Sequence, residues 1–179
     1  MQNSNTTGRT ARKQVPAIAK MISPALSPGM INLDIGAGPY DDFSNWLRSR
    51  GVMNLPTDLE HPTALGETID EQLEWLDKFK ALGGWIDTVT ISNVLNVIED
   101  DIDLRSTLRF AADYVRPKGK VYVTVYEGDR SGEGRKTRDG YQRHEKLALY
   151  MAHCAHEFHE ITKRGNLLIL SDAIQYPKS

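Results

Sequence analysis

A glycine-rich segment that follows an apolar run has the residue types of a ligand-binding loop. It contains Asp34, Gly36, Ala37, Gly38 and Tyr40. Glycine has no Cβ and adopts positive φ values readily, so its backbone can approach a ligand closely. A dinucleotide-binding loop would have a third glycine where an aspartate follows Tyr40, and the acids here would repel a pyrophosphate. The segment therefore favours a small ligand that carries positive charge.

A second acidic position follows the next apolar run. Asp58 lies 24 positions after Asp34, close to the roughly 20-residue spacing at which dinucleotide folds place the acid that binds ribose hydroxyls. Glu60 is the reserve candidate for the same contact.

The composition is that of an ordinary globular protein. The chain has 179 residues, a formal net charge of -2 and 40% hydrophobic residues, which predicts a single domain over residues 11–179 after a flexible N-terminus at 1–10. The single Cys154 fits a reducing compartment, and the polar start lacks the apolar core of a signal peptide. We therefore expect a cytoplasmic protein with no membrane span.

The spacing of apolar residues predicts alternating helices and strands. Helices are expected near 15–22, 42–50, 66–82, 100–118 and 141–155, strands at 30–36, 52–58, 86–91 and 119–128, and a closing hairpin at 158–172 that turns near Gly165. This order predicts an α/β fold with a doubly wound, mostly parallel sheet, helices on both faces and a C-terminal antiparallel hairpin. No strand is visible between Asp58 and Trp85, so the sheet is expected to be trimmed around its third strand.

In such sheets ligands bind beyond the carboxyl ends of the strands. Asn93 and Asn96 follow one predicted strand, and Tyr126 and Glu127 end the next, so these side chains are expected to face one crevice. Glu127 is a candidate for a general base or a group that orients the acceptor. The alternative is that it pairs with an arginine of the following loop.

These features together resemble the class I S-adenosylmethionine-dependent methyltransferases. Asp34, Gly36 and Gly38 match the first family motif, and Tyr40 replaces its last glycine. The resemblance implies an S-adenosylmethionine cofactor held by the glycine loop, with the ribose hydroxyls on Asp58.

The segment "ISNVLNVIED" occupies the place of the family's fourth motif, where the methyl group meets its acceptor, and Asn93 and Asn96 are the polar members considered there. Together with "YVRPKGKVYVTVYEGDRSGEGR", it resembles a smaller group of phage-borne and DNA-modification-associated methyltransferase-like proteins. This likeness covers roughly residues 31–170.

A basic segment follows the last parallel strand. Between Arg130 and Lys146 there are six Lys or Arg and three Asp or Glu, a local charge of +3. The glycine-rich part at 129–140 is expected to be a mobile loop that grips phosphate, or else a solvated charged surface. The candidate acceptor-binding residues are Arg130, Arg135, Lys136, Tyr141 and Gln142, the last two through stacking or hydrogen bonds to a base.

A metal site is not expected, because His153, His156 and His159 have no zinc-ligand spacing. The leading hypothesis is a methyltransferase that acts on a nucleic-acid base or nucleotide, with Asn93, Tyr126 and Glu127 at the reacting centre. The Asp/Asn-Pro-Pro-aromatic motif of DNA amino-methyltransferases is absent, and Cys154 does not follow a proline as in cytosine-C5 enzymes. A small-molecule acceptor stays open, as does a non-catalytic protein that holds or depletes S-adenosylmethionine.

Overall fold

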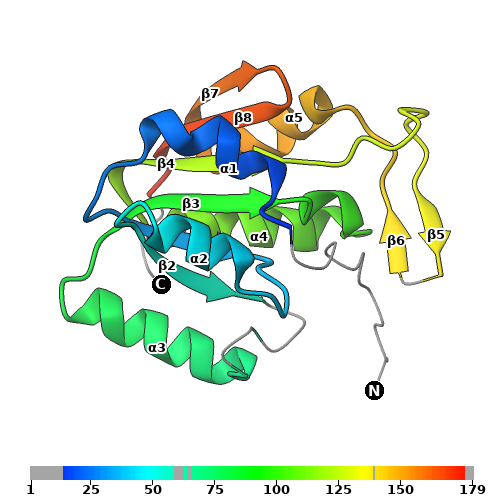
Figure 1. Cartoon of the computed structure of the whole chain (residues 1–179). Coiled ribbons are helices and arrows are strands. Elements are labelled where there is room, and N and C mark those ends of the chain that lie inside the picture. Colours follow the sequence, from blue (N-terminus) through cyan, green and yellow to red (C-terminus); the bar gives the residue numbers. More distant parts are fainter. Residues whose placement is uncertain (1–13, 59–62, 64–65, 139, 176–179) are drawn as a thin grey trace.

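A six-stranded sheet forms the centre of the computed structural model, which describes residues 14–58, 63, 66–138 and 140–175 (Figure 1). In their order across the sheet, the strands are β2 (Met53–Thr57), β1 (Ile31–Ile35), β3 (Ile86–Ser92), β4 (Val115–Thr124), β8 (Leu167–Ala173) and β7 (Phe158–Arg164). The first four are parallel, β8 runs antiparallel to β4, and β7 pairs antiparallel with β8 and so runs in the direction of the first four. The predicted flexible N-terminus at 1–10 lies outside the described residues.

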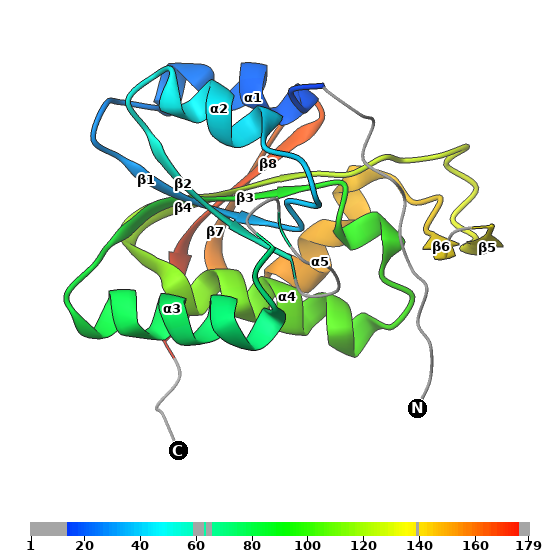
Figure 2. The same cartoon turned by 60° about the horizontal axis from the view of Figure 1, so that its bottom comes forward.

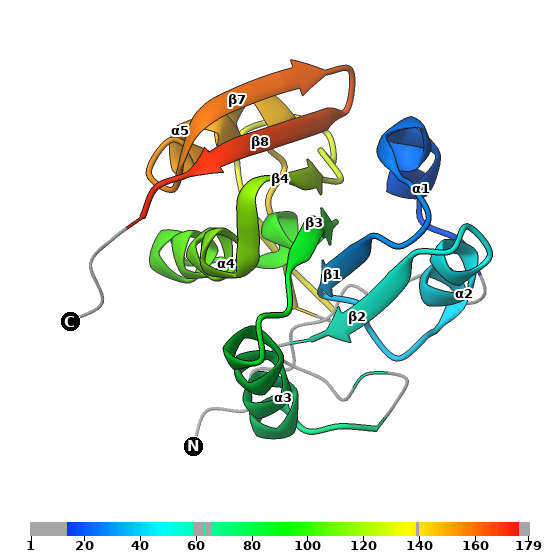
Figure 3. The same cartoon turned by 90° about the vertical axis from the view of Figure 1, so that its left-hand side faces the viewer.

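Helices cover both faces of this sheet (Figure 2). Viewed along the strands, α1 (Ala17–Ile22) and α2 (Asp42–Arg48) lie on one side, and α3 (Ile69–Ala81), α4 (Asp101–Tyr114) and α5 (Tyr150–Cys154) lie on the other (Figure 3). Short 3-10 turns are η1 (Ser23–Ala25), η2 (Leu95–Val97) and η3 (Leu147–Leu149). The predicted doubly wound α/β architecture is confirmed. None of the described helices is long and apolar enough to cross a bilayer.

Among the described residues, β2 is the last strand on its side of the sheet. The next described element is α3, which begins at a capping box: Thr68 Oγ1 accepts from the Glu71 N–H, and the Glu71 carboxylate accepts from the Thr68 N–H. Pro56 lies in this edge strand, where the lack of an N–H donor costs no ladder bond and discourages pairing with another chain.

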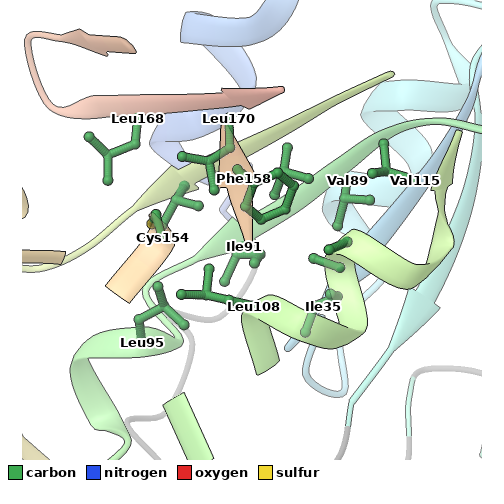
Figure 4. Close-up of a cluster of buried hydrophobic side chains, with 14 of the residues drawn as sticks. Ile35, Val89, Ile91, Leu95, Leu108, Val115, Cys154, Phe158, Leu168 and Leu170 are labelled. Carbon is green, nitrogen blue, oxygen red and sulfur yellow. The ribbon is translucent and has the colours of Figure 1, made fainter. Parts of the chain in front are cut away.

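The two faces of the sheet differ in chemistry. Leu33 and Ile35 of β1 pack with Leu108 of α4 in the larger apolar core, which Figure 4 shows. Because side chains alternate along a strand, Asn32 and Asp34 point to the face that α1 and α2 cover. Parallel strands are usually apolar on both faces, so the buried polar layer on this side is unusual.

Helix α4 ends earlier than its basic residues suggested. The prediction that Arg116 and Lys118 finish the helix was wrong, because α4 ends at Tyr114 and both residues belong to β4. Steric contact with a proline disfavours helical φ and ψ for the residue before it. Pro117 therefore keeps Arg116 out of the helix. Lys118 then takes a φ of 66° where the β3–β4 register shifts.

The segment 129–155 differs most from its prediction. Instead of a loop at 129–140 followed by one helix, it contains a two-stranded ribbon of β5 (Arg135–Thr137) and β6 (Gly140–Gln142), then η3 and the five-residue α5. The ribbon stands out from the body at the side where β3 and β4 end (Figure 1). The apolar spacing over 141–155 favours a helix, but the contacts of Arg143 with distant residues, described below, stabilise a different backbone path.

The closing hairpin is confirmed. Strands β7 and β8 pair antiparallel, and Gly165 and Asn166 form the connection between the paired Arg164 and Leu167. Gly165 has a φ of 58°, and a positive φ at the first of two turn residues is the arrangement of a type II′ hairpin turn. Because β8 runs antiparallel to β4, this turn lies at the carboxyl end of β4.

Candidate functional site

The glycine loop and the end of β2 are joined by hydrogen bonds. The N–H groups of Gly36 and Ala37 donate to the carbonyl of Thr57 at 2.7 and 3.2 Å. Gly38 N–H donates to Oδ2 of Asp58 at 3.0 Å, and Asp58 is buried. The structure therefore brings together the glycine loop and the second acidic position, Asp58, which lies 20 residues after Gly38 in the sequence.

Helix α3 supports this junction from below. Gln72 is buried, and its Oε1 accepts from the Asp58 N–H at 2.9 Å. Its Nε2 donates to the carbonyl of Glu67 at 3.0 Å. Glu60, the reserve candidate for the ribose contact, lies outside the described residues.

Gly36 is required for two physical reasons. Its φ is 76°, which is strained for a residue with a side chain. A Cβ at Gly36 would also lie 2.2 Å from Cγ2 of Val94, in the segment after β3. The segment after β1 and the segment after β3 are therefore in direct contact.

Asp34 belongs to a buried polar layer. Its Oδ1 accepts from Thr90 Oγ1 at 2.8 Å. Asn32 Nδ2 donates to Asn54 Oδ1 at 2.8 Å and to Thr90 Oγ1 at 3.0 Å, and Thr88 Oγ1 donates to Asn32 Oδ1 at 2.8 Å. The layer crosses β2, β1 and β3 just before their carboxyl ends and fixes the strand that leads into the glycine loop.

Burial in this layer raises the pKa of Asp34 to about 7. The hydrogen bond from Thr90 opposes the rise in pKa, and the nearby carboxylate of Asp58 adds to it. A cation bound beside the loop would favour the ionised form of Asp34.

Asn93 lies where β3 ends, in a conformation that is rare for a residue with a side chain. Its φ is 58°, its N–H donates to the carbonyl of Thr124 at 2.9 Å, and its side chain is exposed. Asn96 is buried, and its Oδ1 accepts from the Tyr126 N–H at 3.4 Å. These bonds join the ends of β3 and β4 and leave the Asn93 side chain exposed at that end of the sheet.

Tyr126 and Glu127 point to different partners. Tyr126 is 62% exposed, whereas the Glu127 carboxylate accepts from the Leu147 N–H at 2.7 Å and pairs with Arg130 Nε at 2.6 Å. The Leu147 N–H, Arg130 and Lys163 together hold the pKa of Glu127 below its usual value. Glu127 is therefore an ionised group that fixes the segment after β4, and its pairing with a loop arginine is the alternative that the sequence left open.

Some candidate acceptor-binding residues form ion pairs or hydrogen bonds within the protein, and others are exposed. Arg130 is bound to Glu127, and Arg135 pairs with Asp129 at 3.2 Å. Gln142 Nε2 donates to the carbonyl of Tyr126 at 3.2 Å. Lys136 is exposed on β5.

Tyr141 shapes the ribbon itself. A Cβ at Gly134 would lie 1.5 Å from its hydroxyl oxygen, so Tyr141 packs directly on Gly134. This packing gives Tyr141 a structural contact beside its predicted stacking role.

Arg143 is a key residue that sequence reasoning placed only within a basic run. It is buried, and its guanidinium donates to the carbonyls of Ile98 and Glu99 at 2.6 and 2.7 Å and to Asp101 Oδ1 at 2.7 Å. Its backbone N–H donates to the carbonyl of Asn96 at 2.7 Å. Arg143 thus fastens the base of the ribbon to the segment after β3, and no local signal distinguishes it from the exposed cations nearby.

The three histidines near Cys154 do not converge. His153 is in α5, His156 follows the helix and His159 is in β7. Across the described residues, no three His, Cys, Asp or Glu side chains are placed to hold a metal ion.

Comparison with solved structures relates this arrangement to methyltransferases. DesVI of Streptomyces venezuelae matches with a TM-score of 0.56 at 13% identity, over 89% of this chain and 92% of that one. An S-adenosylmethionine-dependent methyltransferase from Clostridium acetobutylicum matches with a TM-score of 0.53 at 11% identity, over 87% and 89%. Magnesium protoporphyrin IX methyltransferase from Synechocystis, with bound S-adenosylmethionine, gives 0.50 at 14% identity, over 87% and 76%.

No protein-family model and no curated protein matches the sequence. The fold is nevertheless that of the class I methyltransferases, which confirms the predicted fold class. At these identities the likeness extends to the fold alone.

Replacement of Gly36 by alanine should destabilise the protein more than the same change at Gly83. Both glycines have positive φ, 76° and 81°, but a Cβ at Gly83 meets nothing within 4 Å. We expect a cost of about 1 kcal/mol for Gly83→Ala from backbone strain and about 2–4 kcal/mol for Gly36→Ala, which adds the clash with Val94. Urea denaturation measures both, and equal costs would contradict the close packing of the two loops.

Asp34 should make stability fall as pH rises. The folded protein retains a proton on Asp34 between about pH 4 and pH 7, whereas the unfolded chain has released it, so the free energy of unfolding decreases through this window and then levels off. For the wild type this decrease in the free energy of unfolding should amount to roughly 2–4 kcal/mol, at about 1.4 kcal/mol per pKa unit, and in the Asp34→Asn variant it should be absent. Denaturation curves from pH 4 to pH 8 should show the variant gaining on the wild type. The exposed Asp103→Asn is the matched control, and parallel curves for Asp34→Asn and wild type would refute the buried proton.

Proposed function

We propose that this protein is an S-adenosylmethionine-dependent methyltransferase. The observation that carries the proposal is the contact of Gly38 N–H with Asp58 at the carboxyl ends of β1 and β2, within a class I methyltransferase fold. It places a carboxylate beside a glycine loop at the edge where open α/β sheets bind their ligands. The similar structures include S-adenosylmethionine-dependent enzymes, one of them with this cofactor bound.

The loop suits this cofactor chemically. Gly36 and Gly38 have positive φ, and the Asp58 carboxylate supplies negative charge near a ligand with a sulfonium and an ammonium group. Such a cation would favour the ionised form of Asp34, whose pKa is raised to about 7. Asp58 would accept hydrogen bonds from the ribose hydroxyls, while the loop from Gly36 to Tyr40, Ala37 included, would contact the rest of the cofactor. When bound, the cofactor supplies an activated methyl group.

Asn93 and Tyr126 are the groups best placed to act on the acceptor. Both are exposed, and they lie at the ends of the adjacent strands β3 and β4. Methyl transfer depends mainly on placing the acceptor in line with the methyl group and excluding water, which polar side chains at this rim can provide. Glu127 orders the rim through Leu147 and Arg130, so its contribution is positioning.

The acceptor in this proposal is a nucleic-acid base or nucleotide. Support comes from the β5–β6 ribbon, which extends from the rim of the site and carries the exposed cations Lys136 and Arg138. Its attachment through Arg143 keeps these charges near the strand ends. The closer resemblance to phage-borne and DNA-modification-associated proteins is part of the same proposal.

One observation favours a second function. Glu127, the candidate general base, is committed to two partners, as expected for a protein that binds the cofactor without catalysis. Incubation with methyl-labelled S-adenosylmethionine and DNA, RNA or nucleotides separates the two functions. Label in polymer or nucleotide supports the enzyme, whereas cofactor binding with no transfer supports the binding protein. Absence of calorimetric binding at millimolar cofactor would overturn both.

Asp58→Ala should weaken binding of S-adenosylhomocysteine by about 1.5–3 kcal/mol, the usual cost of losing a hydrogen bond to a charged group. Because Asp58 also supports Gly38, the 2′-deoxy analogue of the ligand serves as the control. Wild-type protein should prefer the ribose form, and Asp58→Ala should bind both forms alike. If Asp58→Ala still prefers the ribose form as strongly as the wild type does, the ribose contact belongs to another residue, with Glu60 as the next candidate.

The ribbon cations should set the salt dependence of nucleic-acid binding. Lys136→Gln with Arg138→Gln should reduce the slope of log K against log salt by about 2, because each lost phosphate contact contributes about 1. Cofactor affinity should be unchanged. Lys118→Gln with Lys120→Gln makes the same change of charge near the amino end of β4 and is the control. Fluorescence anisotropy with labelled DNA and RNA measures both slopes, and equal slopes would remove the ribbon from the nucleic-acid contact.

A further inference from the structure

A hollow of about 670 Å³ lies at the carboxyl end of β4, and its lining adds Lys163 and Asn166 to residues that the sequence already assigned to the acceptor. One wall is formed by the segment after β4 and the other by the β7–β8 turn. Its polar lining residues are Tyr126, Glu127, Arg130, Lys163 and Asn166. This volume is within the range of small-molecule sites. A smaller hollow of about 310 Å³ lies beside α2 and the start of β2, away from these strand ends.

The charge of the larger hollow is positive. Arg130 and Glu127 form an ion pair at 2.6 Å, and the other bond of Glu127 is to the Leu147 N–H at 2.7 Å. Lys163 is exposed, and its register opposite Leu168 places it on the sheet face of the larger core. With two cations and one anion, the hollow keeps one net positive charge.

The uncharged lining residues add hydrogen-bonding and stacking groups. Asn166 contributes an amide, which can donate to an anionic oxygen. Tyr126 contributes an exposed ring and hydroxyl, and aromatic rings stack on planar ligand groups. Cation, amide and ring together suit a ligand with an anionic group next to a flat ring.

The hollow adjoins the proposed transfer site through shared backbone. The Tyr126 N–H bonds to Asn96 after β3, and the carbonyl of Thr124 accepts from the Asn93 N–H. A ligand anchored here would thus lie next to the segment that carries Asn93. The ribbon is bound to the same place, because Gln142 donates to the carbonyl of Tyr126.

We propose that this hollow binds the anionic group of a small methyl acceptor, with Lys163 as its principal cation, Asn166 as a donor and Tyr126 against the acceptor's ring. The inference rests on the proposed methyltransferase function and narrows its acceptor to a nucleotide-sized anion.

The test measures probe binding to protein saturated with S-adenosylhomocysteine, so that the cofactor site is filled. The probes are cytidine 5′-monophosphate, orotate and cytidine, which carry a phosphate, a carboxylate and no anionic group, respectively. Lys163→Gln should weaken binding of the anionic probe about tenfold, as expected for loss of a charge-assisted hydrogen bond. Lys120→Gln, the control on β4, should leave it unchanged. Glu127→Gln should strengthen it, because the change removes the negative charge of the hollow.

Tighter binding of cytidine 5′-monophosphate than of cytidine, with this pattern of variants, supports a phosphate acceptor, and the same pattern with orotate supports a carboxylate. Cytidine binding as tightly as the anionic probes, or equal effects of Lys163→Gln and Lys120→Gln, would overturn the inference. Calorimetry with S-adenosylhomocysteine on the same preparations tests the proposed function separately. If that ligand fails to bind, the anion titration without it still decides whether the hollow is an anion site.

Discussion

The contact between Gly38 N–H and the Asp58 carboxylate joins the two strands on which the site depends. With no third strand beside it in the described structure, β2 is an edge strand, and its carboxyl end needs support from elsewhere. Gln72 of α3 supplies that support by accepting from the Asp58 N–H. A trimmed sheet thus keeps the loop geometry of the fold because a helix residue holds the end of its edge strand.

The two faces of the sheet differ in their polar content. The face toward α3, α4 and α5 is an apolar core that supplies most of the burial. The other face combines a smaller apolar core under α1 and α2 with hydrogen-bonded Asn and Thr side chains around Asp34. A buried carboxyl group with a pKa of about 7 costs stability when it ionises. A cationic ligand that binds beside the ionised Asp34 would offset this loss of folding stability.

The rim beyond β3 and β4 is ordered by charged groups that point inward. Arg143 fastens the ribbon to the segment after β3, and Glu127 fastens the segment after β4 to η3. Paired groups of this kind fix one arrangement of loops, since each lost partner would leave an unpaired polar atom. Arg143 and Glu127 thereby hold the ribbon and one wall of the hollow at the same end of the sheet.

The sequence by itself determined the order of elements, the parallel sheet with its closing hairpin, the missing third strand and the glycine loop with its two acids. These features follow from local patterns: apolar spacing, turn residues and the lack of a Cβ in glycine. Only the tertiary structure decided that Val94 packs on Gly36, that Glu127 is committed to Leu147 and Arg130, and that residues 135–142 form a ribbon. Each of these depends on a partner far away in the chain or on competition among several partners. Arg143 shows the reason most clearly, because burial and three distant oxygen acceptors, not its neighbours in sequence, separate it from the cations around it.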